Sequence, residues 1–268
     1  MQHVQLLDDG VEPEVAELCR VTGDAPPAAA DATMIAALSV GVPLAFTALS
    51  RTLGAQSVAP LLDALNFALT LEYLEDEFYR TGITRLGSTF TAAENNAIRQ
   101  ISMHEVAHVA FLRVIISDFF SSTPVAKPAF DFTAKGAFPD VFTNKVTFLA
   151  VAQAFEDTGV RAYKGQAGNV AANKAVLTAA LQIHSVEARH ASQIRRLRGQ
   201  KGWITNADRG TLPAATQAVY NGEDNTTHAG VNAAPLGTNF GGVAAVTEAF
   251  DEPLTKDQVL AIVMPFLA

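Results

Sequence analysis

The sequence has 268 residues, of which 49% are hydrophobic and 17% charged, and its formal net charge is −8. This length and composition describe a globular chain with a sizeable core, and the acidic balance without a Lys/Arg-rich face argues against a nucleic-acid-binding surface. The single cysteine, Cys19, excludes an intrachain disulfide and any cysteine-based zinc or iron–sulfur site.

The chain is predicted to have three parts: an N-terminal arm over 1–56, a helical bundle over 57–198 and a C-terminal extension over 199–268. The arm is acidic and contains an uncharged, mostly apolar run over 32–50. This run lacks the basic segment that opens a secretory signal, and a glycine, a proline and several hydroxyl residues weaken it as a membrane span. Packing on the bundle, export and membrane contact all stay open, so the localisation is left between the cell envelope or exterior and the cytoplasm.

Two helices are predicted in the first half of the bundle. The first begins with a cap at Ser57 and runs to about Arg80, where Thr81-Gly82 is expected to stop it. The second opens at Thr91, because Thr91-Ala-Ala-Glu94 is a capping-box pattern, and it runs to about Phe119. Together they predict a helical hairpin.

A second hairpin follows a long connection over 120–142, which is rich in proline. Its helices are predicted over 143–165, where Gly165 and Gly168 are expected to end the helix, and over 171–198. Two hairpins joined by one long crossover give an all-α fold with the connectivity of ferritin-like four-helix bundles.

The end of the bundle and the extension carry two further patterns. The basic run from Arg189 to Arg198 is predicted to be the solvated end of a helix, where positive charge is favourable. The extension is mostly irregular until the capping-box pattern Thr255-Lys-Asp-Gln258, which predicts a short last helix. We expect this extension to wrap over the bundle or over a neighbouring subunit of a homo-oligomer.

Each of the four predicted bundle helices carries a glutamate on its apolar stripe. An ionised glutamate in that position is costly to bury unless a positive group compensates it. Two of the helices add a histidine three residues after the glutamate, and Glu-x-x-His delivers two metal ligands from adjacent turns. The predicted metal ligands are Glu72, Glu105, His108, Glu156, Glu187 and His190.

The two halves of the bundle repeat the same order of polar residues. Tyr79 follows Glu72 by seven residues, and Tyr163 follows Glu156 by seven residues. Two antiparallel hairpins with this repeat would meet about a two-fold axis. The two tyrosines are the candidate catalytic residues: they would hydrogen-bond a ligand or pass an electron, with a simple core role as the alternative.

Three polar residues near the predicted ligands are assigned other roles. Glu75 is the alternative inward carboxylate on the first helix, although the repeat assigns that role to Glu72. His104 and His184 are expected behind the ligands or at the surface.

Four carboxylates and two imidazoles suit two iron or two manganese ions. The four negative charges also balance two divalent cations, which makes burial of the ions in an apolar bundle tolerable. Two classes of function stay open. One is a redox enzyme acting on oxygen or peroxide; the other is a non-catalytic stress-protective or scaffold protein in which the metal is structural.

Three segments, Asn66–Tyr79, His104–His108 and Glu248–Leu254, resemble the desiccation-related proteins of plants and bacteria within the ferritin-like superfamily. The similarity covers roughly residues 57–268. It implies a ferritin-like four-helix bundle with a dinuclear metal site and a link to desiccation or stress. Bacterial relatives often begin with a twin-arginine export signal; the apolar run lies at that place in this chain, but the twin arginine is missing. The resemblance thus implies a fold and a metal site for this chain, and it does not imply a substrate.

Overall fold

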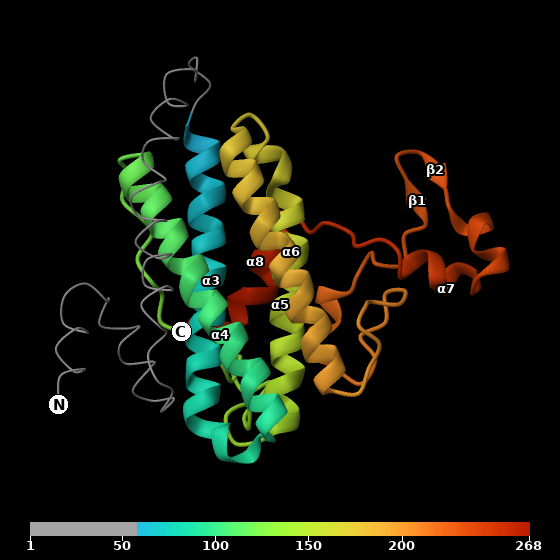
Figure 1. The fold of residues 1–268 in the computed structure, drawn as a ribbon, viewed down its shortest axis with the longest axis horizontal. Helices are drawn as coiled ribbons and strands as arrows, with labels where there is room; N and C mark the ends of the chain where they lie inside the picture. Colours follow the sequence, from blue (N-terminus) through green and yellow to red (C-terminus); the bar gives the residue numbers. More distant parts are fainter. Residues whose placement is uncertain (1–57) are drawn as a thin grey trace, which may run out of the picture. The chain divides into compact units, whose positions relative to one another are not determined.

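Four long helices lie side by side and form the body of the protein (Figure 1). The computed structural model describes residues 58–268, so the predicted arm, its apolar run and the cap expected at Ser57 lie outside the described residues. Within the described part, no helix has the length and apolarity needed to cross a membrane. The four helices are α3 (Ala59–Leu86), α4 (Ala92–Val114), α5 (Lys145–Val170) and α6 (Lys174–Leu197). The predicted all-α bundle of two hairpins with one long crossover is confirmed.

Helix α3 is longer than predicted. The glycine that was expected to end it lies inside the helix, where its missing side chain leaves room for an aromatic ring. The helix passes Gly82 and ends at Leu86, where η1 (Gly87–Thr89) follows. A Cβ on Gly82 would lie 2.2 Å from Cε2 of the fully buried Phe148. The predicted stop at Thr81-Gly82 is therefore wrong: the missing side chain makes room for a packed ring from α5.

Helix α4 begins as predicted and changes its winding near its end. The side chain of Thr91 accepts a hydrogen bond from the backbone N–H of Glu94, and the Glu94 carboxylate accepts one from the backbone N–H of Thr91. The helix then continues into a π-helical turn, η2 (Ile115–Phe119). Turns of this type are rare and occur frequently at functional sites.

The second hairpin also passes a glycine that was expected to end a helix. Helix α5 continues through Gly165 and Gly168 to Val170, which corrects the predicted end. A Cβ on Gly165 would lie 1.8 Å from the carbonyl oxygen of Leu254, so the extension crosses α5 at this point in backbone contact. Helix α6 ends at Leu197 and is followed by Gly199 with φ +72°, close to the predicted end.

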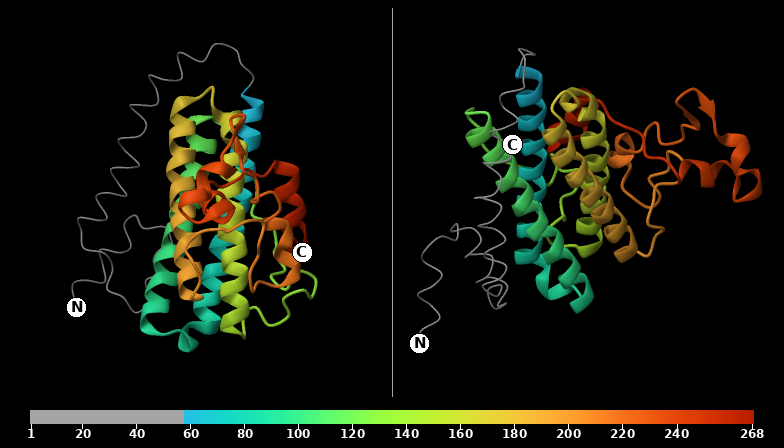
Figure 2. Two further views of the ribbon diagram at one scale, coloured as in Figure 1. Left: turned by 90° about the vertical axis from the view of Figure 1, so that its right-hand side faces the viewer. Right: turned by 45° about the horizontal axis from the view of Figure 1, so that its top comes forward.

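The extension forms short elements and then returns to the bundle. Figure 1 and Figure 2 show the hairpin and α7 projecting away from the bundle on the side of α5 and α6, whereas α8 packs on α5. The two strands are antiparallel, and α8 opens with the predicted capping box at Thr255. The elements are η3 (Ala214–Val219), β1 (Thr227–His228), β2 (Val231–Asn232), η4 (Ala234–Asn239), α7 (Gly242–Thr247), α8 (Lys256–Val263) and η5 (Met264–Phe266).

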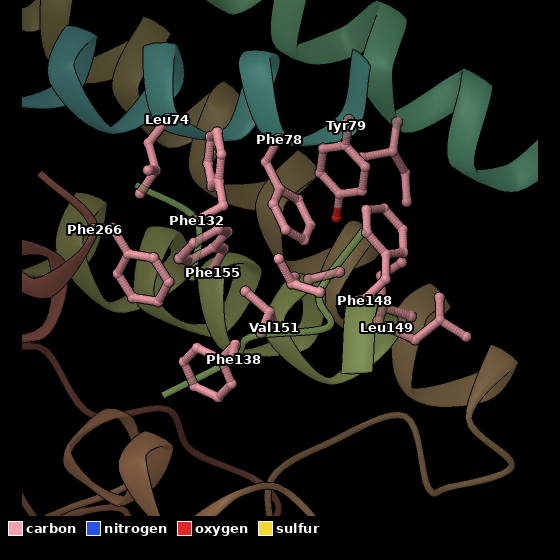
Figure 3. Packing of buried hydrophobic residues seen from close by; sticks show 14 of the residues in the cluster. Leu74, Phe78, Tyr79, Phe132, Phe138, Phe148, Leu149, Val151, Phe155 and Phe266 are labelled. Atoms are coloured by element: carbon pink, nitrogen blue, oxygen red, sulfur yellow. The ribbon is translucent and has the colours of Figure 1, made fainter. Parts of the chain in front are cut away.

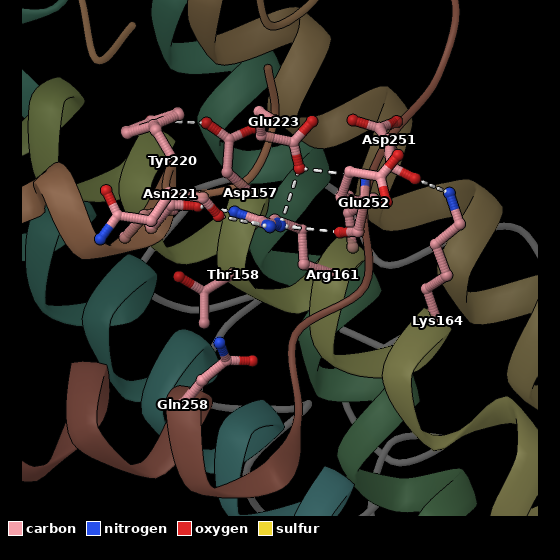
Figure 4. Close-up of polar contacts among 12 residues, drawn as sticks. Asp157, Thr158, Arg161, Lys164, Tyr220, Asn221, Glu223, Asp251, Glu252 and Gln258 are labelled. Carbon is pink, nitrogen blue, oxygen red and sulfur yellow. Dashed lines mark hydrogen bonds and ion pairs between the residues drawn. The ribbon is translucent and has the colours of Figure 1, made fainter. Parts of the chain in front are cut away.

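A buried arginine on α5 holds the extension on the bundle (Figure 4). Arg161 donates hydrogen bonds to the backbone carbonyls of Val219, Asn221 and Glu252, the last two at 2.9 and 2.7 Å. Its guanidinium also lies 2.8 Å from the buried carboxylate of Glu223. The extension thus wraps over its own bundle, the first of the two predicted arrangements.

A second buried arginine corrects the prediction of a solvated basic run. Arg195 is buried and donates two hydrogen bonds of 2.5 Å to the carboxylate of Asp157 on α5. The same carboxylate accepts a hydrogen bond of 2.6 Å from Tyr220 in the extension. Arg198 in turn donates to the side chain of Gln153. The prediction of a solvated run rested on the favourable interaction of positive charge with a helix end. Arg195 is instead buried because it pairs with the carboxylate of Asp157, which is 38 residues away in the sequence.

The two ends of the bundle are filled differently. At the end where α3 passes to α4, aromatic rings fill the core (Figure 3). There Phe78 stacks on Phe148 at 4.6 Å between ring centroids and meets Phe155 edge-on at 5.0 Å, and Phe155 meets Phe266 at 4.8 Å. The opposite end is filled mainly by aliphatic side chains. We call these regions the aromatic end and the aliphatic end.

Candidate metal centre

The six predicted ligands meet between the four helices, and all six are buried. They form two overlapping groups in which the potential ligand atoms lie within 4.8 Å of one another. The first group is Glu72, Glu105, His108 and Glu187, and the second is Glu105, Glu156, Glu187 and His190. Two carboxylates, those of Glu105 and Glu187, belong to both groups, and each group adds one further Glu and one His.

One imidazole nitrogen faces three carboxylates in the first group. His108 Nδ1 lies 3.2 Å from Glu72 Oε2, 3.0 Å from Glu105 Oε2 and 3.2 Å from Glu187 Oε1. A single N–H can serve only some of these acceptors, and the Glu187 contact does not have hydrogen-bond geometry. The imidazole nitrogen and the three carboxylate oxygens therefore lie close together, but one N–H cannot hydrogen-bond to all three oxygens.

The second group contains buried atoms with no hydrogen-bond partner in the described part of the chain. His190 Nδ1 lies 2.9 Å from Glu105 Oε1 and 3.2 Å from Glu156 Oε2, yet neither contact has hydrogen-bond geometry. Both oxygens of Glu187 are also without a partner. Each such atom costs about 1–3 kcal/mol when buried. Oxygen and nitrogen atoms arranged in this way fit a bound cation.

The electrostatics of the centre also favour added positive charge. Burial lowers the pKa of His108, but the carboxylate of Glu72 outweighs this and holds the pKa well above its usual range. For His190, burial lowers the pKa, while the charge of Glu156 and its other acidic contacts raise it to about 11. Burial raises the pKa of Glu105 to about 7. Without a metal ion, protons supply the positive charge that the carboxylates require.

The two candidate tyrosines each contact the glutamate of the other half of the repeat. Tyr79 donates a hydrogen bond to Glu156 Oε1, and Tyr163 donates one of 2.5 Å to Glu72 Oε1. Burial, followed by the charge of the partner glutamate, raises the pKa of both phenols well above the usual value. Both therefore stay protonated as donors. Both rings also belong to the packed core, and a part for either tyrosine in a reaction stays a prediction.

A further buried carboxylate, Glu75, lies near the six candidate ligands without belonging to either ligand group. Glu75 is buried, and burial followed by the charge of Glu187 raises its pKa well above the usual value. In the repeat it corresponds to Gly159, as Glu72 corresponds to Glu156. A Cβ on Gly159 would lie 3.4 Å from Glu75 Oε1, which is ordinary contact, and 3.0 Å from Glu187 Oε2, so the missing side chain on α5 leaves room mainly for the Glu187 carboxylate. The repeat predicts Glu72 as the inward carboxylate of α3 and Glu75 only as its alternative, whereas both are buried. Residues three apart share one face of a helix, so the spacing of the two glutamates was the signal for this in the sequence.

His104 and His184, which the sequence places behind the ligands or at the surface, belong to neither ligand group. His104 Nδ1 lies 2.8 Å from His190 Nε2, with the two rings stacked at 5.1 Å, and its other nitrogen contacts the side chain of Gln100 at 2.8 Å. His184 Nδ1 contacts the carbonyl oxygen of Val160. The contact from His104 fixes the ring of His190 so that Nδ1 faces the carboxylates, which is how outer contacts orient metal-binding histidines.

Residues 61–200, just over half of the chain, match the family described as ferritin-like domain. The match includes all six residues of the two ligand groups and both tyrosines. No curated protein matches the chain. The narrower resemblance to desiccation-related proteins stays a prediction.

Proposed function

The chain belongs to the ferritin-like domain family, and we propose that its bundle holds a dinuclear iron or manganese centre that reacts with oxygen or peroxide. The observation that carries this proposal is the pair of overlapping ligand groups with two shared carboxylates. Glu105 and Glu187 would bridge the two ions. Glu72 with His108 would complete one ion's set, and Glu156 with His190 the other's.

The donor atoms support iron or manganese over other metals. Carboxylates and imidazoles suit these ions, and thiolates, which select zinc or iron–sulfur clusters, are absent from the described residues. Four carboxylates balance the charge of two divalent ions inside the apolar core. When bound, such ions supply Lewis-acid and electron-transfer chemistry.

The residues around the ligands would hold the centre in place and keep bulk water out. Tyr79 and Tyr163 fix one oxygen each of Glu156 and Glu72, which limits the rotation of these two carboxylates. Their protons remain on the phenol oxygens because their pKa values are raised by burial and by the partner glutamates. The aromatic end closes one side of the centre with packed rings.

Metal analysis tests this proposal directly. Protein purified without added metal, and protein reconstituted with ferrous or manganous ions, should contain about two ions per chain. The double variant Glu105→Ala/His190→Ala should bind neither ion while its helix content, measured by circular dichroism, stays close to wild type. The control is Glu77→Ala, because Glu77 lies on α3 but pairs with Lys127 outside the ligand groups. Unchanged metal content in the double variant would refute the assignment of the ligands.

A non-catalytic stress-protective or scaffold protein is the second candidate, and the closed aromatic end together with the buried arginine contacts favours it. In that case the loaded protein would react with oxygen or peroxide no faster than the free ion does. Stopped-flow absorbance with each oxidant separates the two candidates. The link to desiccation, membrane contact through 32–50 and assembly into a homo-oligomer stay predictions.

A further inference from the structure

The aliphatic end of the bundle contains a cavity of about 30 Å³ directly beside the centre. All of its lining residues except Tyr163 and Gln166 are apolar, and all four long helices contribute to it. The lining residue Leu71 immediately precedes Glu72 in the sequence. Tyr163 connects the two regions, because its ring lines the cavity while its hydroxyl donates to Glu72.

The cavity wall has few polar atoms, and two of them have hydrogen-bond partners outside the cavity. The Tyr163 hydroxyl donates to Glu72, and the side-chain oxygen of Gln166 accepts a hydrogen bond of 2.8 Å from Asn169. A buried water needs two to four polar partners, and apolar cavities stay dry. A peroxide molecule would likewise lose its hydrogen bonds to water on entering, which costs about 1–3 kcal/mol for each unsatisfied group. The wall therefore favours an apolar occupant.

The volume limits the occupant to a small molecule. A cavity needs roughly 10–15 Å³ to hold one water-sized molecule, and a cavity that takes up benzene measures about 150 Å³. At about 30 Å³ the cavity suits a diatomic molecule and excludes an organic ring. The small side chains of Ala64, Ala68 and Ala180 leave this space open.

Two further features set this end of the bundle apart. The winding of α4 becomes π-helical at Ile115, whose side chain lines the cavity. On α6 and the facing part of α4, the lining residues Phe111, Ala179 and Ala180 are only partly buried, so the cavity approaches the surface between these helices. The aromatic end offers no such route, because its rings are packed against one another.

We propose that this cavity is a dry chamber that admits dioxygen, and not peroxide, to the centre. This inference rests on the proposed function and chooses between its two oxidants. Because the chamber is a property of the packed side chains, its occupancy can be measured on the metal-free protein.

The first measurement uses dioxygen itself as the probe. In the metal-free protein under oxygen pressure, paramagnetic relaxation should be enhanced at the methyl groups of Ile115 and Ala180, which line the cavity. The methyl groups of Ile98, fully buried at the aromatic end, serve as the internal control. Enhancement no greater at Ile115 and Ala180 than at Ile98 would overturn the proposal.

The second measurement fills the chamber. Ala180→Leu places a larger side chain at its partly buried wall, and Ala110→Leu, at an exposed position on α4, is the matched control. The larger side chain should make it about 1–3 kcal/mol less favourable for dioxygen to occupy the chamber. The metal-loaded protein should then react with dioxygen at least about five-fold more slowly. The reaction with peroxide should keep its rate, and the control should change neither rate.

Each result separates the two proposals. Selective slowing with dioxygen supports the chamber, whereas unchanged rates or equal slowing with both oxidants overturn it. If Ala180→Leu does not fold, the relaxation measurement on the wild-type protein decides alone. A wild-type protein that takes up no metal would end the proposal of a dinuclear centre, and the relaxation measurement would still decide whether dioxygen occupies the cavity.

Discussion

Replacing Gly159 with alanine would place one methyl group against the carboxylates of the centre. The new Cβ would lie 3.0 Å from Glu187 Oε2 and 3.4 Å from Glu75 Oε1. Since ordinary contact begins near 3.4 Å, the Glu187 carboxylate has to move by about 0.4 Å while Glu75 can stay in place. The substitution therefore perturbs a proposed bridging ligand without removing any donor atom.

Two effects of opposite sign follow from this methyl group. Alanine in place of glycine inside a helix contributes about 1 kcal/mol of stability. A shift of about 0.4 Å uses up nearly all of the roughly 0.5 Å within which functional side chains have to be held, and changes that disturb the support of a metal ligand typically cost about 10–100-fold in affinity, so we expect the low end of that range. We expect Gly159→Ala to keep or raise the free energy of unfolding of the metal-free protein and to weaken metal binding about ten-fold.

Gly168→Ala is the matched control, because it lies on the same helix and its Cβ would have no atom within 4 Å. It should gain helix stability and leave metal binding unchanged. Urea unfolding of the metal-free proteins and competition with a chelator measure the two quantities separately. If Gly159→Ala binds metal as tightly as Gly168→Ala does, the argument that the space at Gly159 positions Glu187 for a metal is refuted.

Three further predictions concern packing, ligand support and protons. Gly82→Ala would bring its Cβ to 2.2 Å from Phe148, whose ring is held by stacking on Phe78, and should lower the free energy of unfolding by about 1–3 kcal/mol. Urea unfolding measures this, and a variant as stable as wild type would contradict it. His104→Ala removes the side chain that contacts His190 Nε2 and should weaken metal binding about ten-fold in a chelator competition; wild-type affinity would show that the contact does not support the ligand. Because the pKa of Glu105 is raised to about 7 and that of His190 to about 11, bound protons must leave when a metal ion binds, so affinity should rise between about pH 6 and pH 8. Calorimetry in buffers of different ionisation enthalpy measures the released protons, and a pH-independent affinity without proton release would argue against the metal site.

The sequence was sufficient for the helices and for the residues that meet at the centre. Capping boxes at Thr91 and Thr255 depend on contacts within four residues, and both form as predicted. The stripe of apolar residues fixes which side of each helix faces the core, so a glutamate on that stripe has to point inward. The internal repeat then selected Glu72, Glu105, His108, Glu156, Glu187 and His190, which the structure brings together. Their binding of metal remains a proposal.

The predictions that failed share one physical cause. Gly82 and Gly165 look like helix ends, but each leaves space for a group that arrives from another part of the chain, Phe148 or the backbone of Leu254. The basic run at the end of α6 looks solvated, yet Arg195 is drawn inward by Asp157. Local patterns carry no information about a partner that is distant in the sequence.

Helical periodicity, local caps and the internal repeat were enough to predict the four long helices, the capping boxes of α4 and α8 and the convergence of the six polar side chains. The tertiary structure alone decided the crossed contacts of Tyr79 and Tyr163, the support of His190 by His104, and the inward position of Glu75. It also decided that one end of the bundle is filled with rings while the other keeps a cavity. Contacts between helices depend on how side chains of different sizes pack in three dimensions, and a one-dimensional pattern does not contain that information.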